Sequence, residues 1–155
     1  MDKAKKADRY LRIYGQLHKL VNKTSDPTAR MATIAAVLHH KFDYYFWTGF
    51  YHLLDDALTV VCYQGAVACL VLAAHTGVCW TALDEKKTVI VDDVNAFEGH
   101  IACDSRSASE IVVPVYNNEG QILSVLDVDS KELATFDEID AEWLEKIVAL
   151  IHKQD

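Results

Sequence analysis

The segment DYYFWTGFYHLLDDALTVVCYQG restricts the possible folds of this chain more than any other part of it. Its first half, residues 43–54, is rich in aromatic side chains and has a two-residue period, which is typical of a β-strand. After two aspartates, residues 57–65 have the same character. The segment therefore predicts a β-hairpin, and the domain must contain a sheet.

Three other segments have the three- and four-residue apolar spacing of amphipathic helices. The first spans residues 3–22, the second begins at SDPTARMATIAAVLHHKF, and the third follows TFDE. Asp26 is the predicted N-cap of the second helix, and Pro27 suits its first turn. TFDE predicts a capping box for the third helix. These helices need an apolar surface to cover, and the predicted sheet supplies it.

The order of the elements predicts the fold class. Further strands are expected at residues 68–72, 89–91, 111–116 and 122–129, with a short helix near residues 78–84. This order predicts an α+β domain, in which an antiparallel sheet has the N- and C-terminal helices on one face. The other face is free for a binding site, and the loop-rich middle of the chain folds over it as a lid.

Composition excludes some classes of function. A chain of 155 residues has the usual size of one domain. Its apolar runs are much shorter than the ~20 residues of a membrane span. The formal charge of -8 argues against a nucleic-acid partner, because such proteins normally have a basic face. The N-terminal segment lacks the apolar core of a signal peptide, so we expect a cytoplasmic protein with reduced cysteines.

Three acidic side chains of the last two strands should meet on one face of the sheet. If NNEG is a four-residue loop, Tyr116 pairs with Gln121, and the same register puts Glu110 opposite Asp127. Asp129 shares the face of Asp127, because side chains alternate along a strand. Opposed like charges destabilise a sheet, which favours a site that binds a cation or ammonium group, or keeps one carboxyl protonated as a general acid. Alternatively, the acids only shield a strand end beside solvent.

The aromatic strand offers a second wall for such a site. Trp47, Gly49 and Tyr51 share one face at two-residue spacing. Trp47 and Tyr51 could enclose a small apolar group between them. An aromatic stripe is also typical of ordinary core packing, so this interpretation depends on the neighbouring carboxylates.

The cysteines suggest redox or metal chemistry. Cys62 lies within an apolar strand and is interpreted as an inert buried thiol. Three interpretations stay open for the other cysteines, which are Cys69, Cys79 and Cys103. They could be unrelated buried thiols, a zinc site completed by His100, or a nucleophile with a resolving partner. Cys103 is the best placed nucleophile, since Arg106 and His100 are near enough in sequence to favour its thiolate.

Five segments, in this order, resemble the free methionine-R-sulfoxide reductases, whose chain is a single GAF domain: FWTGFY, YQGAVAC, TGVCW, DVNAFEGHIACDSRSASEIVVPV and LSVLDVDSKELATFDEID. The resemblance covers about residues 33–151. The segment GHIACDSRSASEIVVP is its most specific part, because sensory GAF domains lack the three cysteines. It implies one GAF domain over residues 1–155, with residues 1–24 as an N-terminal helix.

The resemblance also implies roles for the three cysteines. Cys103 would attack the sulfoxide sulfur, release methionine and become a sulfenic acid. Cys69 would then close a disulfide with it, and Cys79 would be an alternative or auxiliary resolving thiol. A thioredoxin-type reductant would restore the thiols. The family implies a homodimer, and no metal or organic cofactor.

The same resemblance assigns the substrate-binding residues. Glu110, Asp127 and Asp129 correspond to the acidic cluster, which would bind the ammonium group of the free amino acid and donate a proton to the departing oxygen. Trp47 and Tyr51 match the aromatic wall that would hold the substrate's methyl group.

The chain departs from the family pattern beside Cys79. Family members usually have glycine after this cysteine, whereas this chain has Trp80. Trp80 could narrow the lid or change how Cys79 moves. The alternative class of function is a small-molecule-sensing GAF module, which keeps the pocket and performs no chemistry.

Overall fold

The computed structural model describes residues 1–100 and 103–154; Ile101 and Ala102, which belong to the most specific sequence segment, and Asp155 lie outside the described residues. Within this part of the chain, six strands form one antiparallel sheet in the order β3-β2-β1-β6-β5-β4. The strands are β1 (Trp47–Leu54), β2 (Ala57–Gln64), β3 (Val71–Leu72), β4 (Val89–Val91), β5 (Ser109–Tyr116) and β6 (Ile122–Ser130). The helices are α1 (Lys3–Val21), α2 (Pro27–Lys41), α3 (Gly77–Glu85) and α4 (Glu138–Val148), with a 3₁₀ turn η1 (Val94–Ala96).

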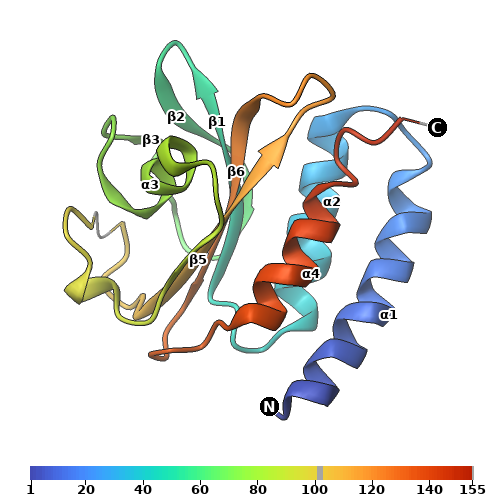
Figure 1. Ribbon diagram of the computed structural model, residues 1–155, viewed down its shortest axis with the longest axis horizontal. Coiled ribbons are helices and arrows are strands. Elements are labelled where there is room, and N and C mark those ends of the chain that lie inside the picture. Colours follow the sequence, from blue (N-terminus) through green and yellow to red (C-terminus); the bar gives the residue numbers. More distant parts are fainter. Residues whose placement is uncertain (101–102, 155) are drawn as a thin grey trace.

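The helices divide between the two faces of the sheet (Figure 1). Helices α1, α2 and α4 lie together on one face, whereas α3 and the long connections around it lie on the other. The predicted α+β class, with terminal helices on one face and a loop-rich lid on the other, is confirmed. Over residues 1–100 and 103–154, no helix is both long and apolar enough to cross a membrane.

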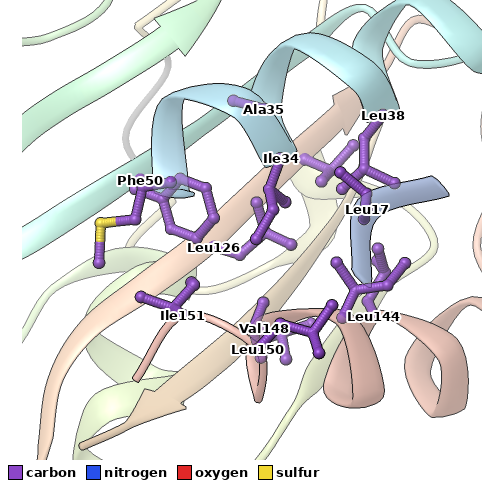
Figure 2. Packing of buried hydrophobic residues seen from close by; sticks show 14 of the residues in the cluster. Leu17, Ile34, Ala35, Leu38, Phe50, Leu126, Leu144, Val148, Leu150 and Ile151 are labelled. Carbon is purple, nitrogen blue, oxygen red and sulfur yellow. The ribbon is translucent and has the colours of Figure 1, made fainter. Parts of the chain in front are cut away.

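The main core lies between the sheet and the three helices. Phe50 of β1 and Leu126 of β6 belong to this core and are fully buried. Figure 2 shows Leu17, Ile34 and Leu144, which come from three different helices and belong to the same buried cluster as these strand residues. Because neighbouring strand residues point to opposite faces, burying Phe50 and Leu126 on the helical side directs the next residue of each strand to the other side.

Helix capping is confirmed at α2 and differs from expectation at α4. The Asp26 carboxylate accepts a hydrogen bond of 2.8 Å from the Ala29 amide, and Pro27 occupies the first turn, as predicted. The capping box of α4 is formed by Asp137 and Asp140, not by TFDE. The Thr135 hydroxyl instead lies 3.0 Å from Ser130 Oγ and 3.0 Å from the Glu132 carbonyl. Thr135 therefore belongs to the preceding loop. The N-cap of α4 is Asp137, two residues later than predicted.

The aromatic hairpin forms as predicted, with tighter limits. Its turn consists of Asp55 and Asp56, with φ values of 50° and 61°. Two consecutive residues with positive φ match the twist of a two-residue hairpin, and aspartate tolerates this conformation. Strand β1 begins only at Trp47, because the preceding aromatic residues form a turn against the core. Strand β3 is likewise shorter than predicted, and residues 68–70 are part of the connection before it.

The predicted register of the last hairpin is wrong by two residues. Glu110 pairs with Asp129 rather than with Asp127. The register shifts by one residue at the turn, because Tyr116 pairs with Ile122 instead of Gln121. It shifts by a second residue at an irregularity between Val115 and Tyr116. A shift of two leaves every side chain on its original face. The three acids therefore still converge, although the opposed pair is a different one.

Asn117 explains why the connecting loop is longer than expected. Its side-chain Oδ1 accepts hydrogen bonds from the amides of Glu119 and Gln121, at 3.0 Å and 2.9 Å. Its own amide donates to the Gln121 carbonyl at 2.9 Å. These bonds make Gln121 part of the turn. Tyr116 therefore pairs with Ile122 instead of with Gln121.

Candidate active site

A cavity lies on the face of the sheet that carries α3. Its walls come from β1, β5, β6, the start of α3, and the loops that contain Cys69 and Cys103. It measures about 60 Å³ in the space open to the centres of water molecules. Four acids line it, which are Asp104, Glu110, Asp127 and Asp129. Among its described lining residues there is no lysine or arginine, so the cavity is suited to cations.

The sheet register places the acids on the cavity floor. Asp127 lies opposite Gly49, and Asp129 lies between Trp47 on one side and Glu110 on the other. Glu110 and Asp127 are buried, with 5% and 7% of their surface exposed. Asp127 Oδ1 has no hydrogen-bond partner among the described residues. A buried carboxylate oxygen without a partner carries a desolvation penalty, which a bound donor or cation would relieve.

The carboxyl groups hold protons more tightly than usual. Burial raises the pKa of Glu110 well above its ordinary range, and the charges of Asp127 and Asp129 raise it further. Burial, with the charges of Asp127 and Asp104, also raises the pKa of Asp129. The pKa of Asp127 is raised by burial, which polar contacts with Glu110 and Cys79 partly oppose. The cluster therefore retains a proton at a pH where isolated carboxyls are ionised.

A disulfide joins Cys69 to Cys103, and Cys103 lines the cavity. The two residues are 34 positions apart in the sequence, and their Cα atoms are 5.5 Å apart. Cys69 lies in the connection between β2 and β3, and Cys103 lies in the loop that enters β5. The Tyr51 hydroxyl donates a hydrogen bond of 3.1 Å to the Cys69 carbonyl. Tyr51 thereby links the aromatic strand to the disulfide loop.

The two other cysteines are free thiols in different environments. Cys79 is buried in the first turn of α3 and lines the cavity. Burial, followed by the charges of Asp127 and Glu110, raises the pKa of its thiol well above the ordinary value. Cys62 is half-buried against the helical core, and burial raises its pKa to about 11. Cys62 is thus remote from the cavity chemistry, as expected for an inert thiol.

The aromatic wall forms as the two-residue spacing predicts. The ring of Trp47 stacks on those of Tyr51 and Tyr63, with centroids 5.9 Å and 5.4 Å apart. A Cβ atom at position 49 would lie 2.5 Å from Trp47 Cη2, so only glycine leaves room for the indole. The indole nitrogen donates to the Ala66 carbonyl at 3.0 Å. Gly49 is therefore the reason that Trp47 can lie flat beside the acids.

Arg106 pairs with the residue that directly follows Cys103. In this structure its guanidinium pairs with Asp104, with an Nη2–Oδ2 distance of 2.7 Å, and lies over the Phe46 ring. This pairing lowers the pKa of Asp104 to about 2. His100 does line the cavity, and burial lowers its pKa. Sequence reasoning missed Asp104 and Phe46; the position of Asp104 directly after Cys103 was the available signal.

The zinc set that was one of the three interpretations of the cysteines is not assembled in this structure. Cys69 and Cys103 are bonded to each other, so the set with Cys79 and His100 is not available. Trp80 is buried but is absent from the described lining of the cavity. It packs on His75, with ring centroids 4.6 Å apart, and its Nε1 has no partner among the described residues. Trp80 therefore packs in the buried apolar cluster that α3 forms with the sheet, and does not form part of the described cavity wall.

Comparison with known proteins agrees with this architecture. A family model described as GAF domain matches residues 25–152. GAF domain-containing protein A of Dictyostelium discoideum is 41% identical over 152 residues, covering 97% of this chain and 95% of its own length. An open antiparallel sheet with a cavity under a lid is the arrangement of this class, and the chain belongs to the GAF-domain family.

Two of the relatives and several of the solved structures have a more specific name. Free methionine-R-sulfoxide reductase of Escherichia coli is 39% identical over 125 residues, covering 81% of this chain and 75% of that protein. The X-ray structure of free methionine-R-sulfoxide reductase from Neisseria meningitidis, in complex with its substrate, superimposes with a TM-score of 0.91 at 40% identity. That match covers 98% of this chain and 89% of the other. Within the GAF family, the chain belongs to the free methionine-R-sulfoxide reductases.

Proposed function

We propose that this protein reduces free methionine-R-sulfoxide to methionine. One observation carries the proposal: Cys103, which is joined to Cys69 by a disulfide, lines the same cavity as Glu110, Asp127 and Asp129. Reduction of a sulfoxide by thiols ends in a disulfide, and recognition of a free amino acid requires partners for its ammonium group. Both requirements are met within one cavity, and relatives that share the fold are named for this reaction.

The acidic cluster would bind and protonate the substrate. Asp127 Oδ1 is buried and has no hydrogen-bond partner in the described part of the chain, so it suits an ammonium donor. Glu110 or Asp129, with its raised pKa, would donate a proton to the sulfoxide oxygen. The stacked rings of Trp47 and Tyr51 would contact the methyl group on sulfur. A cavity enclosed by the lid favours a free amino acid over a residue within a polypeptide.

The chemistry would proceed in three balanced steps. The Cys103 thiolate attacks the sulfoxide sulfur, and the oxygen passes to Cys103 as methionine leaves, so Cys103 becomes a sulfenic acid. The Cys69 thiolate attacks that sulfur, the hydroxyl leaves as water after protonation, and the disulfide of this structure forms. A dithiol reductant of the thioredoxin type then reduces the disulfide and is itself oxidised.

Two further expectations belong to this proposal. Cys79 would act as an auxiliary thiol that is less reactive, because burial, followed by the charges of the adjacent carboxylates, raises its pKa and opposes its ionisation. The enzyme would work in the cytoplasm as a homodimer, with a thioredoxin-type protein as partner. Gel filtration with light scattering tests the oligomeric state directly.

The decisive experiment uses separated R and S epimers of methionine sulfoxide, both free and within a peptide, with a thioredoxin system. Methionine should form only from the free R epimer. Cys103→Ser should abolish turnover while circular dichroism shows an intact fold, and Cys62→Ser is the matched control with normal turnover. If the wild-type protein binds the sulfoxide without reducing it, the protein is a sensing module and the proposal is wrong.

The role of Cys69 is tested in the same assay. Cys69→Ser should release about one equivalent of methionine per chain, because Cys103 can still attack once. It should then stop, because no thiol closes the disulfide that the reductant recognises. Full thioredoxin-coupled turnover in this variant would show that Cys79 resolves the sulfenic acid instead.

A further inference from the structure

Three buried groups in the cavity form a compact set of potential metal ligands. The Cys79 sulfur, one oxygen of Glu110 and one oxygen of Asp127 all lie within 4.8 Å of one another. All three residues are buried, and they come from three different elements, α3, β5 and β6. Ligands of a common zinc ion are roughly 3–4 Å apart, given bond lengths of about 2.0–2.3 Å. Side-chain movements of about 1 Å would therefore bring the three ligand atoms to the separations of a zinc site.

A second observation indicates that these three side chains are suited to a bound cation. Asp127 Oδ1 is buried and has no hydrogen-bond partner among the described residues, and Asp127 lines the cavity. The described lining also contains no lysine or arginine that could neutralise the acids. Buried charges are normally paired or coordinate a metal. Among the described lining residues, no cationic side chain balances these carboxyls, so only retained protons or a bound cation can do so.

We propose that the cavity can bind one thiophilic divalent cation, such as zinc, through Cys79, Glu110 and Asp127. The sulfur ligand selects zinc over magnesium and calcium, which prefer oxygen ligands only. Three protein ligands leave a fourth position open toward the cavity for water. The ligand set differs from the zinc set considered as an alternative from the sequence, which combined Cys79 with the two disulfide cysteines and His100.

Binding requires proton release and does not depend on the disulfide. The Cys79 thiol becomes a thiolate on coordination, and the carboxyl cluster gives up the proton that it retains, so both protons pass to solvent. Cys79 is a free thiol while Cys69 and Cys103 are joined. The site therefore exists in the disulfide form, in which Cys79 is the sole thiol of the cavity among its described residues.

The disulfide form permits a direct test with cadmium as a spectroscopic probe. Cd²⁺ is titrated into the metal-free disulfide form, and the ultraviolet charge-transfer band of the cadmium–thiolate bond is recorded. One equivalent per chain should bind with this band, release protons to a pH indicator, and be displaced by Zn²⁺. Cys79→Ser should lose the band, whereas Cys62→Ser, which removes the other free thiol, should keep it. Asp127→Asn should weaken binding at least tenfold.

The outcomes separate clearly. A band that persists in Cys79→Ser, or that is lost in Cys62→Ser, overturns the site, as does the absence of stoichiometric binding to a folded wild-type chain. Near-ultraviolet circular dichroism confirms that each variant is folded. This titration uses no substrate, so it decides the metal site even if the reductase proposal fails. A second arm rests on the proposed function: Zn²⁺ should inhibit competitively with free methionine-R-sulfoxide, and non-competitive inhibition would refute a shared site.

Discussion

The Tyr51 hydroxyl donates a hydrogen bond of 3.1 Å to the main-chain carbonyl of Cys69. This contact connects a rigid strand of the sheet to the connection before β3, which has little regular structure of its own. It also involves the two chemical parts of the cavity, because Tyr51 belongs to the aromatic wall and Cys69 to the disulfide. Tyr51 therefore positions Cys69 in addition to shaping the cavity.

Removing this hydroxyl should slow closure of the disulfide. In Tyr51→Phe, the ring that stacks on Trp47 remains, but the Cys69 loop loses its anchor, worth about 1 kcal/mol. The first equivalent of methionine should still form, whereas the Cys103 sulfenic acid should persist several-fold longer. Trapping with dimedone and mass spectrometry measures its lifetime. An unchanged lifetime would mean that Cys69 is positioned by other contacts.

The acidic cluster should destabilise the fold as the pH rises. The folded-state pKa of Glu110 is raised by burial and by its acidic neighbours, above an unfolded value of about 4.3. The stability contributed by the protonated carboxyl is complete below the unfolded pKa and is lost as the pH rises through the folded pKa. Glu110→Gln should therefore stabilise the protein by about 1–3 kcal/mol at pH 8 and by little at pH 4.5.

Urea unfolding at the two pH values measures this difference. Glu119→Gln is the matched control, because Glu119 is exposed in the β5–β6 turn. If Glu110→Gln destabilises the protein at pH 8, the ionised Glu110 carboxylate is stabilised by its surroundings. Charge repulsion within the cluster then does not lower the stability of the fold. Activity should fall in Glu110→Gln even though stability rises, as is common where a site is built for function.

The N-terminal helix should depend on one buried ion pair. Lys6 Nζ lies 2.7 Å from Asp140 Oδ2, and both side chains are buried between α1 and α4. Tyr10 donates to the other oxygen of Asp140 at 2.7 Å. Lys6→Ala leaves this carboxylate without its counter-ion and should cost about 3–5 kcal/mol in urea unfolding. Lys5→Ala, on the exposed side of the same helix, should cost less than ~0.5 kcal/mol. Equal effects would refute the role of the pair.

Trp80 should matter for packing and little for the cavity. Its side chain is 3% exposed and its Nε1 has no partner among residues 1–100 and 103–154. Trp80→Phe removes the unpaired N–H along with some volume, so it should cost under ~1.5 kcal/mol. Trp80→Gly, which restores the usual family residue, should cost about 4–6 kcal/mol through the void and helix propensity. Thermal unfolding compares the two, and a change in substrate KM for Trp80→Phe would contradict this account.

Local patterns were sufficient for most of the fold. The two-residue period predicted the hairpin of β1 and β2, and the cap at Asp26 marked the start of α2, because both depend on neighbouring residues. The register of β5 and β6 was missed by two residues, since an Asn117 side-chain turn and an irregular pair both lengthen the connection. Neither feature has a pattern in the sequence that distinguishes it from a simple four-residue loop.

The sequence by itself determined which side chains share the cavity face. Alternation along β5 and β6 places Glu110, Asp127 and Asp129 together for any even shift in register, so the error in pairing did not affect the site. Only the tertiary structure decided which partners meet: that Cys69 bonds Cys103, and that the Cys79 sulfur lies among the carboxylates. The reason is physical, because those contacts join residues far apart in the chain, and the packing of α3 and its loops on the sheet brings them together.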